Sequence, residues 1–403
     1  MPVATSHVGA FAGSRRHMGR LERWRRPVAA ACAVAAAAVA AAAGAAPVSA
    51  GAGGPDVEVI ASGLDNPRGL TVVHGDTVLV TEAGRGGDGP CIMGSAGAQV
   101  CLGQTGAVTA IQRAGEHTYD QRRIVTLPSL ASPTEALGPH DVAIGSSGKL
   151  LVMLGLGAPP ASRAQLGDGG ALLGQVVSVK PFGRTRPVAD LAAFEAAHDP
   201  DQGLPGTHVD SNPYGLEVTA HGVFAADAGG NTVLRVGRDG ALSPIAVFAP
   251  RFVAGPDPGS QIPMQSVPTA VTRGPDGALY VGELTGFPFP MGGAKVWRLE
   301  RGEQPQVYAE GFTNIIDIAF DRRGRLHVLE MFENGILAPP PQGELPLGRL
   351  VRVQRDGSQT EIADGALHVP GSLAFGSDGS IYVSNKSTAG PGAGEVLRIR
   401  THK

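Results

Sequence analysis

The chain has 403 residues, of which 42% are hydrophobic and 17% are charged, and its net charge at pH 7 is −3. This composition is that of a globular protein rather than a disordered or fibrous one. The small acidic excess excludes a surface built to attract nucleic-acid phosphates, since such surfaces are strongly basic.

The first 50 residues have the pattern of a secretory signal peptide. Basic residues precede an Ala/Val run at 28–46, and Val48-Ser49-Ala50 offers a cleavage site with small side chains. The run is too short for a membrane span, and its side chains are too small. Ser14-Arg15-Arg16 leaves twin-arginine export open beside the general secretory route, and Met18 is an alternative start to Met1.

Removal of this segment leaves one predicted domain at 51–403. The segment contains six arginines and one glutamate, so the net charge of the remaining chain is −8. No second apolar span and no basic amphipathic helix follows, which predicts an exported protein without a membrane anchor. The frequent arginine and alanine are typical of a high-G+C bacterial coding sequence.

A pattern repeats six times along the predicted domain. In most copies a proline or asparagine marks the start, and every copy continues with a short apolar strand, a glycine turn and a second strand. The starts lie at Pro67, Pro139, Pro213, Pro268, Ile315 and Pro370. Each second strand ends 15 residues after its start, except in the third copy, where the spacing is 14. A repeat of this kind cannot bury its own face, so the copies must pack against one another.

These repeats predict an all-β fold, a six-bladed β-propeller of four-stranded antiparallel blades. Period-two strands follow each pair, but the sixth copy ends after its third strand, near Ile399. The unused strand Glu58–Ala61 is therefore expected to pair with Val396–Ile399 and close the ring, which also protects the strand edges. An alanine-rich segment at 187–198 is expected to form a short helical insertion.

Two cysteines remain after signal cleavage, Cys91 and Cys101, and both lie in one glycine-rich loop. In an oxidising compartment such a pair is expected to form a disulfide. The alternative, a metal site, lacks a neighbouring histidine that could act as a further ligand.

The strand directions place the starts of all first strands on one face of the ring, which we call the mouth face. The long loops 83–106, 155–174, 284–294, 331–348 and 386–394 belong to the same face. Ligands usually bind where loops cover a rigid scaffold. The candidate ligand-binding residues are Arg68, His140, Asp141, Tyr214 and Asp317. They could bind an anionic or phenolic ligand, or they could act as acid–base groups. Alternatively, His140 and Asp141 could satisfy backbone groups at a strand start.

Four acids end second strands at equivalent positions: Glu82, Asp227, Glu283 and Glu330. Four carboxylates at the same height in the ring suggest a metal site, because a hard cation binds several converging oxygens. However, the second strands are set back from the ring axis, so these carboxylates need not converge. The interpretation preferred here is structural, with each carboxylate accepting backbone N–H groups from its own loop or from the adjacent blade.

Three stretches resemble the ScyD/ScyE family of NHL-like propellers. They are Gly63–Leu70, Glu82–Cys91 and Val209–Gly215. The resemblance implies an extracytoplasmic propeller of unestablished activity, associated with synthesis of the pigment scytonemin, and it transfers no catalytic residues. Related propellers, including SMP-30-like lactonases, bind calcium at the starts of the first strands. At those positions this chain has acids only at Asp141 and Asp317.

The function predicted from the sequence is binding of a small molecule, glycan or protein at the mouth face. The alternative is an extracytoplasmic enzyme at the same mouth, either a lactonase-like or strictosidine-synthase-like hydrolase or a quinoprotein-type sugar oxidoreductase. No cofactor is predicted, and a calcium ion on Asp141 and Asp317 in the channel is left open. We expect a monomer with no nucleic-acid partner.

Overall fold

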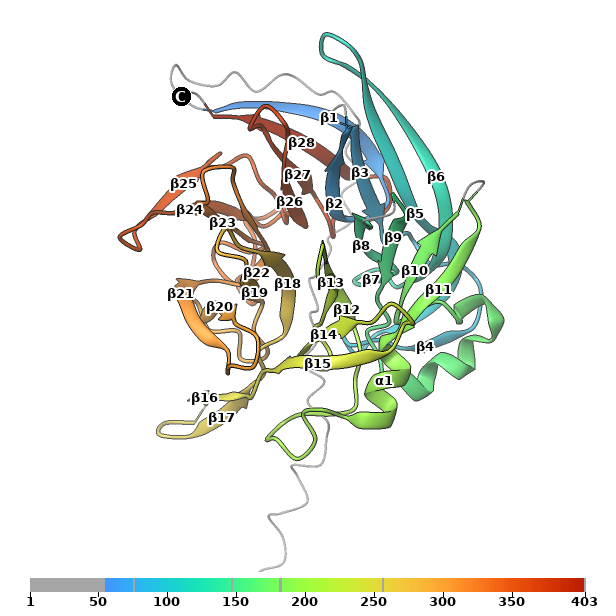
Figure 1. Cartoon of the computed structure of the whole chain (residues 1–403), viewed down its shortest axis with the longest axis vertical. Helices are drawn as coiled ribbons and strands as arrows, with labels where there is room; N and C mark the ends of the chain where they lie inside the picture. The colour runs from blue at the N-terminus through green and yellow to red at the C-terminus, as the bar shows by residue number, and fades with distance from the viewer. Residues whose placement is uncertain (1–54, 75–76, 146–147, 181–182, 256, 402–403) are drawn as a thin grey trace, which may run out of the picture.

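The computed structural model describes residues 55–401 apart from 75–76, 146–147, 181–182 and 256. The predicted signal peptide and both alternative start residues lie outside the described residues. The described chain forms six four-stranded antiparallel blades arranged in a ring (Figure 1), so the predicted six-bladed β-propeller is confirmed. No helix in the described part of the chain is long and apolar enough to cross a membrane.

The blades follow one another along the chain, each from the axis outward. The first three blades contain β2 (Pro67–Val73), β3 (Thr77–Glu82), β5 (Gln99–Gly115) and β6 (Thr118–Ala131); β8 (Pro139–Ile144), β9 (Leu150–Leu154), β10 (Gln175–Val179) and β11 (Thr185–Asp190); and β12 (Pro213–Thr219), β13 (Gly222–Asp227), β14 (Thr232–Val236) and β15 (Leu242–Val247). Short 3-10 helices at Pro160–Leu166 and Asp168–Gly170 lie in the loop between β9 and β10.

The remaining blades repeat the pattern. They contain β18 (Pro268–Arg273), β19 (Leu279–Glu283), β20 (Ala294–Leu299) and β21 (Gln306–Phe312); β22 (Ile315–Phe320), β23 (Leu326–Glu330), β24 (Arg349–Val353) and β25 (Gln359–Ile362); and β26 (Ser372–Phe375), β27 (Ile381–Asn385), β28 (Gly394–Arg400) and β1 (Asp56–Leu64). A hairpin of β16 (Arg251–Ala254) and β17 (Gln261–Met264), which the repeats do not indicate, precedes the fourth blade.

The ring is closed by the N-terminal strand. β1 pairs antiparallel with β28, with Glu58 opposite Arg398 and Ala61 opposite Val396. This confirms the predicted pairing. It occurs because the sixth repeat supplies three strands and leaves β28 with an unpaired edge, which β1 covers.

The hydrophobic core is divided among the blade interfaces. The described residues form six buried apolar clusters, and each joins two neighbouring blades. Between the sixth and first blades, for example, Ile60 and Val396 pack with Leu70, Val78 and Val80.

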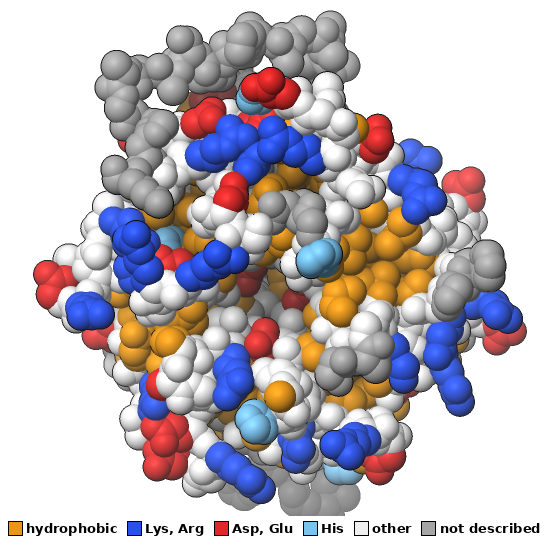
Figure 2. Space-filling model, turned by 45° about the horizontal axis from the view of Figure 1, so that its top comes forward, with side chains coloured by type: hydrophobic (Ala, Val, Ile, Leu, Met, Phe, Trp, Pro, Cys, Tyr) orange, Lys and Arg blue, Asp and Glu red, His pale blue; other side chains and the backbone are white. Residues whose placement is uncertain are grey.

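The surface of the ring is not flat. Figure 2 shows that one face is hollowed near its middle and that acidic side chains lie in and beside the hollow.

The segment predicted as a helical insertion divides into two elements. Residues 187–190 belong to β11, because the second blade needs a fourth strand and Val176 of β10 pairs with Ala189. The helix α1 (Leu191–His198) begins immediately afterwards, and the carboxylate of Asp190 caps it by accepting the Ala193 amide at 2.9 Å.

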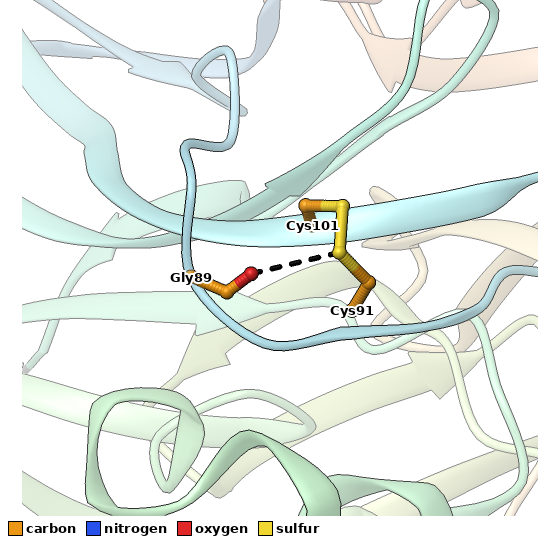
Figure 3. Close-up of a disulfide and its surroundings, with 3 residues drawn as sticks. All are labelled: Gly89, Cys91 and Cys101. Atoms are coloured by element: carbon orange, nitrogen blue, oxygen red, sulfur yellow. Dashed lines mark hydrogen bonds between the residues drawn. A yellow bond between two sulfur atoms is a disulfide. The ribbon is translucent and has the colours of Figure 1, made fainter.

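The predicted disulfide joins Cys91 and Cys101 (Figure 3). The loop between β3 and β5 is more regular than the sequence indicates, because β4 (Cys91–Met93) pairs with β5 and places the two cysteines directly opposite each other. Cys91 Sγ lies 3.5 Å from the Gly89 carbonyl oxygen. Since a disulfide sulfur carries no proton, this is a close contact rather than a donated hydrogen bond.

Candidate functional site

The mouth face contains a large cavity. Its volume is about 1160 Å³, and residues of all six blades or of their loops line it, among them Arg68, His140, Tyr214, Thr269 and Ile316. Cavities that bind small molecules are commonly about 300–1,000 Å³. The cavity can therefore accommodate a ligand of substantial size.

One wall of the cavity contains a buried cation. Arg68 is 5% exposed, and its guanidinium donates hydrogen bonds to the carbonyl oxygens of Ser387 and, at 3.1 Å, Ala136. It thereby connects the first strand of the first blade to the sixth blade and to β7 (Ala136–Leu137), a short strand that pairs with β6. Burial lowers the pKa of Arg68, yet a guanidinium stays protonated in proteins. Among the described residues, no carboxylate oxygen lies within 4.0 Å of it.

His140 lies beside this cation in one defined tautomer. Its Nδ1 is 3.0 Å from the Pro213 carbonyl oxygen, so Nδ1 carries the proton and Nε2 is left as an acceptor. Burial and the positive charge of Arg68 lower the pKa of His140 to about 3. The Tyr214 ring packs against it at a centroid distance of 4.7 Å. A Cβ at Gly155 would approach the imidazole to 2.0 Å, so only glycine fits there.

Neutral His140 is suited to binding rather than to proton transfer. A general acid or base works best with a pKa near the operating pH, and a pKa of about 3 is far below neutrality. His140 can accept a hydrogen bond from a donor group of a ligand. Arg68, beside it, can donate to an anionic or electron-rich oxygen of the same ligand.

The facing wall is apolar. Leu284, Phe289, Ile316, Met331 and Phe332 line the cavity and belong to the buried cluster between the fifth and sixth blades. At its edge, Phe287 is 39% exposed. The cavity thus has a polar side and an apolar side, the usual composition of a pocket for an organic ligand.

A third side of the cavity is formed by connections between blades. Glu135 accepts hydrogen bonds from Ser95 Oγ at 2.7 Å and the Ala96 amide at 3.3 Å, and burial raises its pKa. His208 and Asp210 line the cavity from the segment after α1. No repeat position indicates a role for these three residues, because they lie in the links between blades rather than in the repeats or in the loops inside each blade.

Asp141 and Asp317 do not line this cavity. Asp141 accepts the amides of Val142 and of Leu216 in the next blade, both at 2.7 Å. Asp317 accepts the Ile318 amide and, in the next blade, the Leu373 amide, both at 2.8 Å. These carboxylates join the first strands of neighbouring blades around the channel. A Cβ at Gly69 would come within 2.3 Å of Asp141 Oδ1, so this close contact requires glycine.

The channel is acidic. Burial first, and then the charge of Asp317, raise the pKa of Asp141 well above its usual range, while burial raises the pKa of Asp317 to about 6. Burial also raises the pKa of Glu217, on β12, to about 7, and the attraction of Arg273 does not offset it. The charge of Asp317, on the fifth blade, thus acts on Asp141, on the second blade.

These pKa shifts predict an unusual pH dependence of stability. A carboxyl group with a raised pKa binds more protons in the folded than in the unfolded chain, so its contribution is complete below the unfolded pKa and is lost as the pH rises through the folded pKa. For Glu217 this window runs from 4.5 to about 7.

Glu217→Gln should therefore match the parent protein at pH 4.5 and be more stable than it at pH 8, by about 1–2 kcal/mol in urea unfolding. Asp239→Asn, on an exposed turn of the same blade, should leave the pH profile unchanged. An identical difference between parent and Glu217→Gln at both pH values would contradict the raised pKa.

The four strand-end acids all accept hydrogen bonds within their own blade or its connections. Glu82, Asp227 and Glu330 each accept a main-chain amide from the residues just before the first strand, at 2.7 Å. Glu283 instead accepts from Arg251, Ser266 and Trp297. These contacts fix the turns at the mouth, and the four carboxylates do not converge on one point.

No protein-family model matches this chain, and no curated protein matches it in sequence. Among solved structures, it is similar to a Bacteroides thetaiotaomicron protein of unknown function at 9% identity and a TM-score of 0.51, over 86% of this chain and 72% of that one. It also matches virginiamycin B lyase from Staphylococcus aureus (14% identity, TM-score 0.44, 86% of this chain and 98% of that one). Regucalcin, a calcium-binding protein from Agrobacterium tumefaciens, matches at 11% identity and a TM-score of 0.48, over 87% and 96% of the two chains. Similarity at these identities shows the propeller fold alone.

Proposed function

We propose that this protein is an exported propeller that binds a small organic molecule with an apolar body and an anionic or phenolic end. The observation that carries the proposal is the division of the cavity, with buried Arg68 and neutral His140 on one wall and Phe289, Met331 and Phe332 on another. Burial of the apolar body supplies affinity, and the buried guanidinium selects the charged end.

Export and the ScyD/ScyE-like assignment belong to the same proposal. The signal-peptide pattern at 1–50 and the disulfide are typical of a protein exported to an oxidising compartment. The apolar wall of the cavity suits an aromatic molecule such as a pigment precursor. Binding is preferred over the hydrolase or oxidoreductase alternative, because His140, which lies beside Arg68 in the cavity wall, is held neutral with a pKa of about 3.

We expect the protein to bind a charged ligand more tightly than a neutral ligand of the same shape. In calorimetric titration of the mature protein, naphthalene-2-sulfonate should bind saturably and about tenfold more tightly than naphthalene-2-sulfonamide. Phe287→Ser should weaken sulfonate binding severalfold, because Phe287 lies at the cavity edge. The control Phe252→Ser, on β16 and 57% exposed, should not. Equal binding of the two probes, or equal effects of the two variants, would reject this site.

A further inference from the structure

Three carboxylates converge where the chain leaves α1. Glu195 lies in the last turn of the helix, Asp199 follows its end, and Asp201 comes two residues later. Each offers a carboxylate oxygen within 4.8 Å of the others. Glu195 is 2% exposed and Asp201 is 0% exposed, so two of the three are removed from water. None of the three lies on the first strands β8 and β22 that contain Asp141 and Asp317.

The group has no balancing charge among the described residues. No arginine or lysine nitrogen there lies within 4.0 Å of the three carboxylates, whereas buried Glu82 and Glu283 are each paired with an arginine. Buried charges in proteins are normally paired or bind a metal ion. A cation from solution would supply the charge that the described side chains do not provide.

The carboxylate oxygens also lack hydrogen-bond donors. Glu195 Oε1, Asp199 Oδ1 and Asp201 Oδ1 are buried and have no partner in the described part of the chain. The other oxygen of Asp201 accepts a hydrogen bond from Asn231 Nδ2 at 3.0 Å. Unpaired buried acceptors are rare in folded proteins and call for a ligand or ion. Here each of the three clustered residues has one such oxygen.

The surroundings are negative and leave room for the carboxylates. The charges of Asp227, Asp201, Asp199 and Asp210 all act on Glu195. The carbonyl end of a helix also favours cations over acids. A Cβ at Gly230 would lie 2.7 Å from Glu195 Oε2, so glycine there makes space for this side chain.

We propose that Glu195, Asp199 and Asp201 bind a calcium ion. The donor set is made only of oxygens and contains no histidine or cysteine, which selects a hard cation. Calcium accepts six to eight oxygens in irregular geometry, whereas magnesium requires a near-ideal octahedron, and an irregular loop suits the former. Carbonyl oxygens and waters complete the shell.

Such an ion would organise one side of the mouth. The segment that begins at Asp199 continues to Gly206, His208 and Asp210, all of which line the cavity. Binding at Asp199 and Asp201 therefore holds in place the chain that forms this wall. The role assigned to the ion is structural, and it is independent of the ligand that the cavity receives.

The test is calcium binding by chelator-treated mature protein. Isothermal titration with CaCl₂ should show one site per chain, and calcium at a hundredfold excess over Kd should raise Tm by about 3–5 °C. Magnesium should bind at least tenfold more weakly. No binding below about 1 mM calcium, or a preference for magnesium, would overturn the assignment.

A double variant separates loss of the site from loss of the fold. Glu195→Gln with Asp201→Asn removes charge repulsion, so without calcium its Tm should equal or exceed that of the parent, while the calcium response disappears. Asp239→Asn, an exposed acid on a turn of the third blade, should keep the full response. A retained response in the double variant would refute the site. Because the naphthalene probes are not used, this test can fail while the cavity proposal stands.

Discussion

A mature chain that begins at Asp65, and so lacks β1, is expected to lose its cooperative thermal transition or to unfold at least 10 °C below the parent. β1 pairs with β28 along its whole length and buries Ile60, Ala61 and Leu64 between the sixth and first blades. Burial of large aliphatic side chains is worth about 1.5–3 kcal/mol each, and the open edge of β28 adds a site for aggregation.

The deletion has two controls. A chain that begins at Pro55 keeps β1 and should melt like the mature protein. A synthetic peptide with the sequence of residues 55–64, added to the shortened chain, should restore part of the transition, whereas a scrambled peptide should not. If the shortened chain melted at the parent temperature, β1 would have no role in closing the ring.

Replacement of Glu82 by alanine is expected to cost about 3 kcal/mol of unfolding free energy. Glu82 is fully buried and accepts hydrogen bonds from the Asp65 amide at 2.7 Å, Thr109 Oγ1 at 2.5 Å and Arg123 Nη2 at 2.6 Å. Alanine would leave the buried Asp65 amide without an acceptor and the Arg123 guanidinium with Asp65 as its remaining carboxylate partner. Urea unfolding followed by circular dichroism measures the change.

An exposed ion pair provides the comparison. Glu310 pairs with Lys295 at 3.0 Å, but its side chain is 66% exposed, so Glu310→Ala should cost less than about 1 kcal/mol. Similar costs for Glu82→Ala and Glu310→Ala would mean that the strand-end acid does not organise the turn. A loss at Glu82 alone would explain why an acid ends four of the six second strands.

The fold could be predicted because its information is local and repeated. Each copy contains a marked start, an apolar strand, a turn and a second strand, and such units can bury their faces only against one another. The missing strand of the sixth copy and the spare N-terminal strand then indicated closure. The Cys91–Cys101 bridge followed because two cysteines in one short loop have few other partners.

The candidate site could be predicted only in part. Arg68, His140 and Tyr214 lie at equivalent strand starts, and the structure places all three on the cavity. Asp141 and Asp317 occupy equivalent positions, one residue further along, but their carboxylates contact the amides of the next blade instead. A repeat position thus indicates the level in the ring, whereas the direction of a side chain depends on the neighbouring blade.

The sequence by itself determined the number of blades, the closing strand and the face with the long loops, since these depend on periodicity and on strand count. The tertiary structure alone decided what the connections between blades bring together. Glu135 and the three carboxylates at Glu195, Asp199 and Asp201 come from segments with no common spacing. Their proximity arises from ring closure and from the path of the chain between blades, and no local pattern in the sequence records either.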